Sequence, residues 1–149
     1  MSDLPDDVWA LSGIDQLRHM LEIDGRPPIG RTLDFALVEV EKGRAVFEGE
    51  PDERAYNPLG TVHGGYAATL LDSACGIAVH SHMEPGQSYT TLELKIAYHR
   101  AMTSTTGRVR AEGSVVSLGR RVAFAEAKLT DARGRLLASA TSTLLVITP

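Results

Sequence analysis

One segment, residues 62–83, constrains the fold more than any other because small and apolar side chains fall on every side of it. That pattern predicts a helix buried all round. The helix follows a loop, residues 51–60, which contains two prolines, an asparagine and a glycine, and Thr61 is expected to be its N-cap. A helix without a polar face has to be covered by the rest of the chain. A single carboxylate, Asp72, stands in its middle.

The remaining chain supplies this cover as strands. Apolar and polar residues alternate with period two, the pattern of half-buried strands, in six segments. These segments are residues 31–40, 44–50, 89–98, 107–116, 122–130 and 136–147. The first two are joined by Glu41, Lys42 and Gly43, which predicts a hairpin, and short glycine-containing links predict that the last three form an antiparallel meander.

The N-terminal part predicts one short helix. Ser12 followed by Asp15 resembles a capping box, and apolar residues continue at near-helical spacing until Gly25. The whole order predicts an α+β fold, in which one curved antiparallel sheet of about six strands wraps around the long helix. With 149 residues, we expect one domain over residues 30–149, preceded by an N-terminal segment over residues 1–29.

Charge and composition exclude several partners. The formal net charge is -4 and the chain has no basic run, so nucleic acid is not expected to bind. The longest weakly charged stretch, residues 55–83, is interrupted by an asparagine, a proline, three histidines and Asp72, so no membrane segment is expected. Cys75 is the only cysteine, and the acidic residues 1–7 lack the basic and apolar regions of a signal peptide. We therefore expect a cytoplasmic protein.

Asp72 and the start of the long helix are the candidate reactive groups. A carboxylate inside an apolar helix is costly unless it is paired, so Asp72 is either a working acid or a residue at an exposed edge. At the helix start, His63, Gly64 and Gly65 leave unpaired N–H groups at the positive end of the helix dipole, where an oxyanion could sit. Each glycine costs about 1 kcal/mol of helix stability relative to alanine. The pair is therefore expected either to give a ligand close access to the backbone or to let the helix pack tightly against a neighbour.

The distance between these two groups predicts a second subunit. Gly64 and Asp72 are eight residues apart, which is roughly 12 Å along a helix axis. If Gly64 polarises an acyl carbonyl, the carboxylate has to come from another chain, as in two antiparallel helices related by a two-fold axis. We expect a homodimer, since small residues in the helix would let a second backbone approach: Gly64, Gly65, Ala67, Ala68 and Gly76.

Two adjacent runs carry a family resemblance: Asn57-Pro58-Leu59-Gly60-Thr61-Val62-His63-Gly64-Gly65 and Ala68-Thr69-Leu70-Leu71-Asp72. They resemble the signature of hotdog-fold thioesterases of the phenylacetate-pathway (PaaI-like) and hydroxybenzoyl-CoA type. Residues 89–147 are similar to this family in a less distinctive way, and residues 1–30 carry no resemblance. The resemblance implies a hotdog fold and hydrolysis of a medium-chain or aromatic acyl-CoA, without a cofactor, by a homodimer or a dimer of dimers.

The resemblance also implies roles for individual residues. Asp72 would be general base or nucleophile, and the Gly64 N–H would polarise the thioester carbonyl. Asn57 and His63 would orient substrate or water, and Thr91 matches a position that carries serine or threonine in the family. These roles agree with the chemistry of thioester hydrolysis, which needs a base or nucleophile and a donor aimed at the developing oxyanion.

Substrate-binding candidates flank these groups. Val62 and Gly65 adjoin Gly64 at the helix start. Three arginines, with Gly119 beside two of them, are either phosphate-binding groups for coenzyme A or solvated surface residues: Arg100, Arg120 and Arg121. No metal site is expected, because His80 and His82 are only two residues apart and point to different faces of a helix.

Two alternatives to hydrolysis stay open on the same fold. An acyl-CoA hydratase or dehydratase would need an acid and a histidine at the α and β carbons, whereas the glycine-rich helix start favours a polarised carbonyl. A non-catalytic acyl-CoA-binding module would hold the ligand without turnover. The joint presence of Asn57, His63, Gly64 and Asp72 favours turnover.

Overall fold

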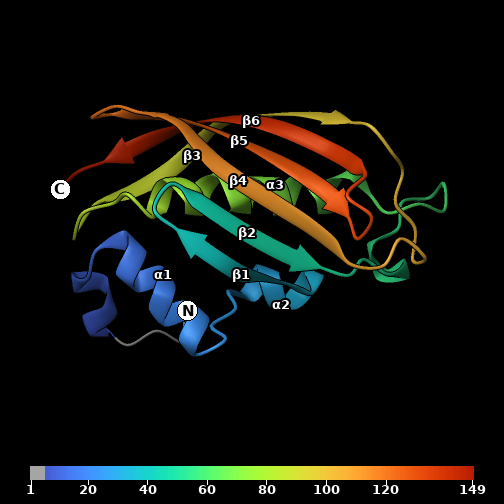
Figure 1. Cartoon of the computed structure of the whole chain (residues 1–149), viewed down its shortest axis with the longest axis horizontal. Helices are drawn as coiled ribbons and strands as arrows, with labels where there is room; N and C mark the ends of the chain where they lie inside the picture. Colours follow the sequence, from blue (N-terminus) through green and yellow to red (C-terminus); the bar gives the residue numbers. More distant parts are fainter. Residues whose placement is uncertain (1–5) are drawn as a thin grey trace.

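The computed structural model describes residues 6–149, in which a single six-stranded antiparallel sheet curves around one central helix, α3 (Figure 1). The strand order in the sheet is β1-β2-β4-β5-β6-β3. This is the hotdog fold that the resemblance implied. The helices are α1 (Gly13–Glu22), α2 (Pro28–Leu33) and α3 (Gly64–His80), with short 3-10 helices at Asp6–Ala10 and Glu53–Ala55. The strands are β1 (Phe35–Glu41), β2 (Arg44–Gly49), β3 (Ser88–Tyr98), β4 (Val109–Leu118), β5 (Val122–Asp131) and β6 (Leu136–Ile147).

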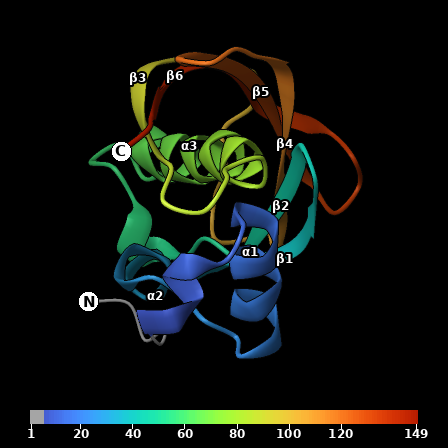
Figure 2. The same ribbon diagram turned by 90° about the vertical axis from the view of Figure 1, so that its left-hand side faces the viewer.

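The central helix is buried as its residue pattern predicts. Figure 2 looks nearly along α3 and shows the sheet arching over it, with α1 and α2 below. The residues of α3 that are shielded from solvent come from several sides of the helix: Tyr66, Ala67, Leu70, Leu71, Ala74, Cys75, Ala78 and Val79. Alanines of β5 face the helix, and Gly113 of β4 lies against the Ala74 carbonyl, so small residues let sheet and helix approach closely.

The predicted strand connections are confirmed. Gly43 closes the β1–β2 hairpin with a φ of 84°, a conformation that glycine adopts without strain. Strands β4, β5 and β6 form the predicted meander. Strand β3, which precedes the meander in sequence, pairs with β6 at the far side of the sheet and is therefore an edge strand.

The first predicted strand begins too early. Residues 28–33 form α2, which starts with a proline in its first turn and ends at Asp34 in the left-handed conformation, so β1 begins only at Phe35. The predicted boundary between residues 29 and 30 falls inside α2, and the division of the chain at this point stays a prediction.

Helix α1 is present where it is predicted and is docked on the C-terminal end of α3. The Gly13 amide donates to the Met83 carbonyl (2.8 Å), and Gln16 Oε1 lies 2.9 Å from Nε2 of His80. Ser12 is the N-cap residue, but its hydroxyl donates to the Asp15 carboxylate (2.6 Å) and does not accept from a backbone amide. The predicted capping box was thus right about the position of the N-cap and wrong about the hydrogen bonds that its side chains make.

Over residues 6–149, no helix has the length and apolar character needed to cross a membrane. Residues 1–5, on which the expectation about a signal peptide partly rests, lie outside the described residues.

Candidate active site

Asp72 is held by a neighbour on the edge strand. The Thr91 hydroxyl of β3 donates to Oδ1 of Asp72 at 3.0 Å. Both side chains are half-buried, on the side of the sheet that faces α3. The structure therefore brings together two of the residues named from the sequence. The hydrogen bond and the partial exposure reduce the free-energy cost of placing a carboxylate in an apolar helix.

The start of α3 differs from the prediction in its cap. Helix α3 begins at Gly64, and the N-cap is His63 rather than Thr61. The His63 ring accepts a hydrogen bond at Nδ1 from the Gly65 amide (2.8 Å). The Gly65 amide is thus already bonded, whereas the Gly64 amide has no acceptor within residues 6–149. One free donor is left at the positive end of the helix dipole.

Tyr98 lies against Gly64, and the sequence reasoning missed it. Its hydroxyl donates to the Gly64 carbonyl at 2.8 Å. A Cβ atom at position 64 would come within 2.9 Å of the Tyr98 hydroxyl oxygen, so contact with this ring is one reason for a glycine there. The available signal was an aromatic residue at the end of an alternating strand, and nothing local indicates that this strand end meets the helix start.

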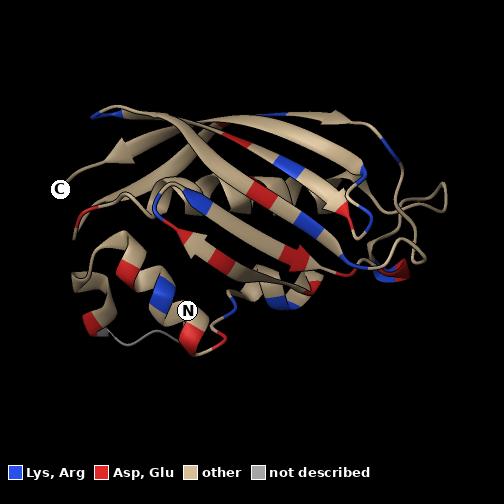
Figure 3. Cartoon of the chain, in the orientation of Figure 1, with Lys and Arg blue, Asp and Glu red and all other residues tan. Residues whose placement is uncertain are grey.

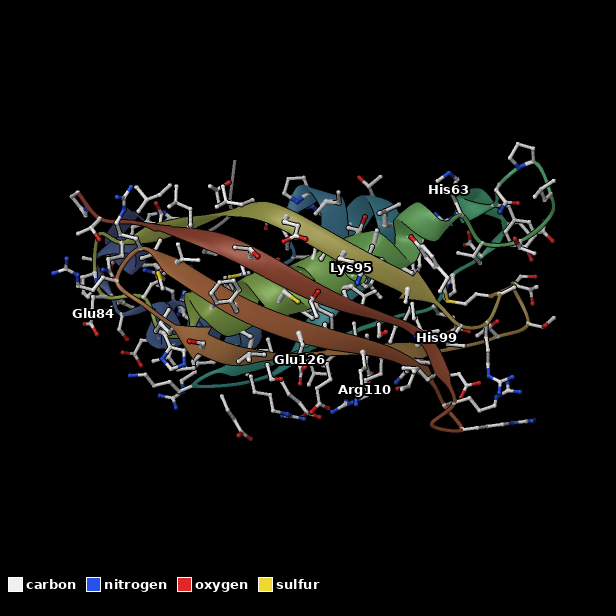
Figure 4. The ribbon with its side chains drawn as sticks, turned by 90° about the horizontal axis from the view of Figure 1, so that it is seen from above. His63, Glu84, Lys95, His99, Arg110 and Glu126 are labelled. Atoms are coloured by element: carbon white, nitrogen blue, oxygen red, sulfur yellow. The ribbon has the colours of Figure 1, made fainter. Side chains whose placement is uncertain are left out.

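A hollow of about 450 Å³ opens at this end of the molecule. It is lined by the start of α3 and the segment after β3: Val62, His63, Gly64, Gly65, Tyr98, His99, Arg100, Ala101 and Met102. Figure 4 shows His63 and His99 at this same end, with Glu84 at the opposite one. The predicted binding residues Val62, Gly65 and Arg100 are thus placed around the free amide, Val62 with a buried side chain.

Asn57 organises the loop before α3. Its Oδ1 accepts from the amides of Leu59 (2.9 Å) and Thr61 (3.3 Å), and its Nδ2 donates to the Thr61 hydroxyl (3.0 Å). The side chain therefore fixes the conformation of residues 57–61. As a result Leu59, at the tip of this loop, is 89% exposed.

Other predicted residues are not near Gly64 in one subunit. Asp72 and Gly64 lie two turns apart on the same helix. Gly119, Arg120 and Arg121 form the β4–β5 turn, where the Arg121 carbonyl accepts from the amide of Val146 near the end of β6. That end of β6 pairs with the beginning of β3, whereas Gly64 contacts the end of β3. The two arginines therefore lie at the opposite end of α3 from the hollow.

Burial raises the pKa of two side chains close to Asp72, those of Cys75 and Tyr89. The pKa of the Cys75 thiol is raised to about 12, first by burial and then by the Asp72 charge. A thiol so protonated is a poor nucleophile. The same two causes, in the same order, raise the pKa of Tyr89 to about 12.

Gly76 and Ala67 differ from the expectation that small residues of α3 let the backbone of a second subunit approach. The Tyr89 ring, not a second backbone, fills the space at Gly76, because a Cβ atom there would lie 2.6 Å from its hydroxyl oxygen. Ala67 is fully buried within its own subunit.

Charged residues of both signs recur along β1, β2, β4 and β5 (Figure 3). Arg110 bridges Glu39 (2.7 Å) and Glu48 (3.1 Å), and Arg44 contacts Glu39 and Glu112. These pairs are partly exposed to solvent, so each adds little to the stability of the fold. Nowhere in residues 6–149 do three metal-binding side chains gather.

Comparison with known proteins identifies the family of this chain. The model of a family described as the thioesterase superfamily matches residues 59–138. A 1,4-dihydroxy-2-naphthoyl-CoA hydrolase from Listeria monocytogenes is 32% identical over 77% of this chain and 92% of its own length. The solved structure of a mutant of the phenylacetic acid degradation protein PaaI from Thermus thermophilus has a TM-score of 0.73 and 28% identity, covering 80% of this chain and 98% of that one. A thioesterase family protein from Silicibacter pomeroyi has a TM-score of 0.78 and 26% identity, over 95% and 99% of the two chains.

The matched residues contain the free Gly64 amide and the bonded pair of Asp72 and Thr91. The chain therefore belongs to the thioesterase superfamily and is a thioester hydrolase.

Proposed function

We propose that the protein hydrolyses medium-chain or aromatic acyl-CoA thioesters at a site shared by two subunits. The observation that carries this proposal is the free Gly64 amide beside the 450 Å³ hollow, eight residues away from Asp72 on one rigid helix. The aromatic acyl group has further support in the name of the Listeria relative, a naphthoyl-CoA hydrolase.

The free edge of β3 supports the dimer. Strand β3 has eleven residues and pairs only with β6 among the described residues, and an open edge of this length is suited to pairing with another strand. A second β3 paired antiparallel to it would continue the sheet and set two α3 helices side by side. Thr69, Asp72 and Ser73 are only partly buried within one subunit, and this face of α3 would then be covered.

In this dimer Asp72 of one subunit meets Gly64 of the partner subunit. The Gly64 amide donates to the thioester oxygen and stabilises the negative charge that develops on it. As general base, Asp72 removes a proton from the water that attacks the carbonyl carbon; as nucleophile, it attacks that carbon itself, and water hydrolyses the resulting anhydride. In either route the C–S bond breaks and the thiolate of coenzyme A leaves.

The remaining predicted residues take supporting roles. Because Nδ1 of His63 accepts from Gly65, the proton of the neutral ring is on Nε2, which can donate to substrate. Asn57 acts by holding the loop before Gly64. Arg100 lies at the hollow, and in an antiparallel pair Arg120 and Arg121 come from the other subunit to the same end, where they bind coenzyme A phosphates.

Thiol release tests this function. Purified protein is incubated with a panel of straight-chain and aromatic acyl-CoA thioesters, and free coenzyme A is measured over time. We expect hydrolysis that falls by about 10²–10⁴-fold in Asp72→Asn. Hydration of an enoyl-CoA without thiol release, or tight binding without any turnover, would refute the proposal.

A further inference from the structure

The face of α3 beyond Asp72 is closed by Tyr89. Asp72, Gly76 and His80 follow each other at intervals of four residues and therefore lie along one face of the helix. The Tyr89 hydroxyl lies over Gly76, where a Cβ atom would be 2.6 Å from it. The Tyr89 ring meets the His80 ring edge-on, with centroids 5.8 Å apart and planes at 61°. Tyr89 thus covers the two turns that follow the carboxylate.

The proposed dimer determines which way the acyl group runs from Asp72. The coenzyme A end lies at the hollow beside Gly64 of the partner subunit, since Arg100 lines that hollow. Toward residue 68 the groove is filled by the partner's helix, because residue 68 lies midway between 64 and 72 and so at the two-fold axis. The path that remains for the acyl group therefore runs along the face of α3 from Asp72 to Gly76.

We propose that Tyr89 is the specificity-determining residue of the acyl pocket, where its ring ends the path about one helical turn, ~5.4 Å, beyond Asp72. The inference rests on the proposed function, since it describes the same site. Within the proposed range of substrates, a path of this length favours aromatic and shorter acyl groups over longer acyl chains. The Tyr89 ring is held there by its packing against the His80 ring and over Gly76.

Three variants test this role on a panel of straight-chain acyl-CoA thioesters of increasing length, read by thiol release. Tyr89→Val removes the ring and should raise kcat/KM for the longer thioesters, relative to the shorter, by about tenfold or more. Tyr89→Phe keeps the ring and should keep the wild-type order of preference. Gly76→Ala pushes the ring off the helix into the path and should shift preference toward shorter acyl groups.

The outcomes separate this inference from the proposed function. A folded Tyr89→Val protein with the wild-type length preference overturns the role of Tyr89 and leaves the thioesterase function standing. If Tyr89→Val does not fold, an unchanged preference in Gly76→Ala overturns it equally. A wild-type protein that releases no thiol from any member of the panel overturns the proposed function, and this inference with it.

Discussion

The Thr91 hydroxyl binds only one oxygen of Asp72, Oδ1, at 3.0 Å, and Oδ2 has no partner within residues 6–149. One oxygen is thus anchored by β3 while the other is free to reach water or substrate. An anchored carboxylate keeps its orientation through the reaction, which is what a positioned base or nucleophile requires.

Removal of this anchor should slow the reaction without unfolding the protein. In Thr91→Val, kcat should fall by about tenfold or more, because a hydrogen bond to a charged group contributes about 1.5–3 kcal/mol. Thr91→Ser retains the hydroxyl and should retain most of the rate. Steady-state kinetics check both variants, and equal rates in Val and Ser would show that the hydroxyl has no part in catalysis.

The free amide of Gly64 can be removed with little change to the helix. Gly64 is the first residue of α3 and His63 before it is already extended, so Gly64→Pro is compatible with the backbone. Loss of the donor should lower kcat by about 10²–10³-fold. Gly64→Ala is the matched control, since it adds the same contact with Tyr98 but keeps the N–H. If alanine and proline lower kcat equally, contact with Tyr98 and not the amide is what matters.

A shared site predicts complementation between two inactive variants. When Asp72→Asn and Gly64→Pro chains are unfolded together and refolded, half of the dimers should be mixed, and each mixed dimer has one intact site. We therefore expect recovery of about a quarter of the wild-type activity. Each variant refolded alone is the control. A mixture no more active than its components, despite mixed dimers detected by mass spectrometry, would place the whole site in one subunit.

The junction of α1 with α3 should be sensitive to acid. Burial lowers the pKa of His80 below its ordinary value of 6.5, so the unfolded chain takes up a proton at this residue before the folded one does. This contribution to stability is complete above the unfolded pKa and is lost as pH falls below it. The wild-type Tm should fall more between about pH 7.5 and about pH 5 than that of His80→Gln, which keeps a polar partner for Gln16. The pKa of His82 is lowered too, but His82 is unchanged in both proteins. Equal falls in Tm would exclude His80 as a source of acid sensitivity.

The sequence predicts the fold well where the signal is local. Helix α3 follows from apolar residues on all its sides, and the hairpin at Gly43 follows from a glycine between two alternating segments. Helix α2 was missed because its six residues are too few for a periodic pattern. The pairing of β3 with β6 could not be read, since it joins segments that are far apart in sequence.

In the candidate site, too, residues with a local signal could be predicted and residues placed by the tertiary structure could not. Gly64 and Asp72 stand out because a glycine pair and a carboxylate are unusual in an apolar helix. Tyr98 and Tyr89 do not stand out, because aromatic residues are ordinary in strands and only the tertiary structure places them on Gly64 and Gly76. The cap was misplaced from His63 to Thr61 because threonine is a common N-cap and histidine is not.

The His63 ring decides what kind of ligand the start of α3 accepts. Helix ends that capture phosphate or sulfate do so by offering several amides at once to several oxygens. Here the His63 ring accepts from the Gly65 amide, so only the Gly64 amide is available. A multivalent anion needs several donors and is bound poorly, whereas a single carbonyl oxygen needs only this one. In the proposed reaction, the imidazole would thus favour binding of the thioester oxygen over binding of the coenzyme A phosphates at this helix end.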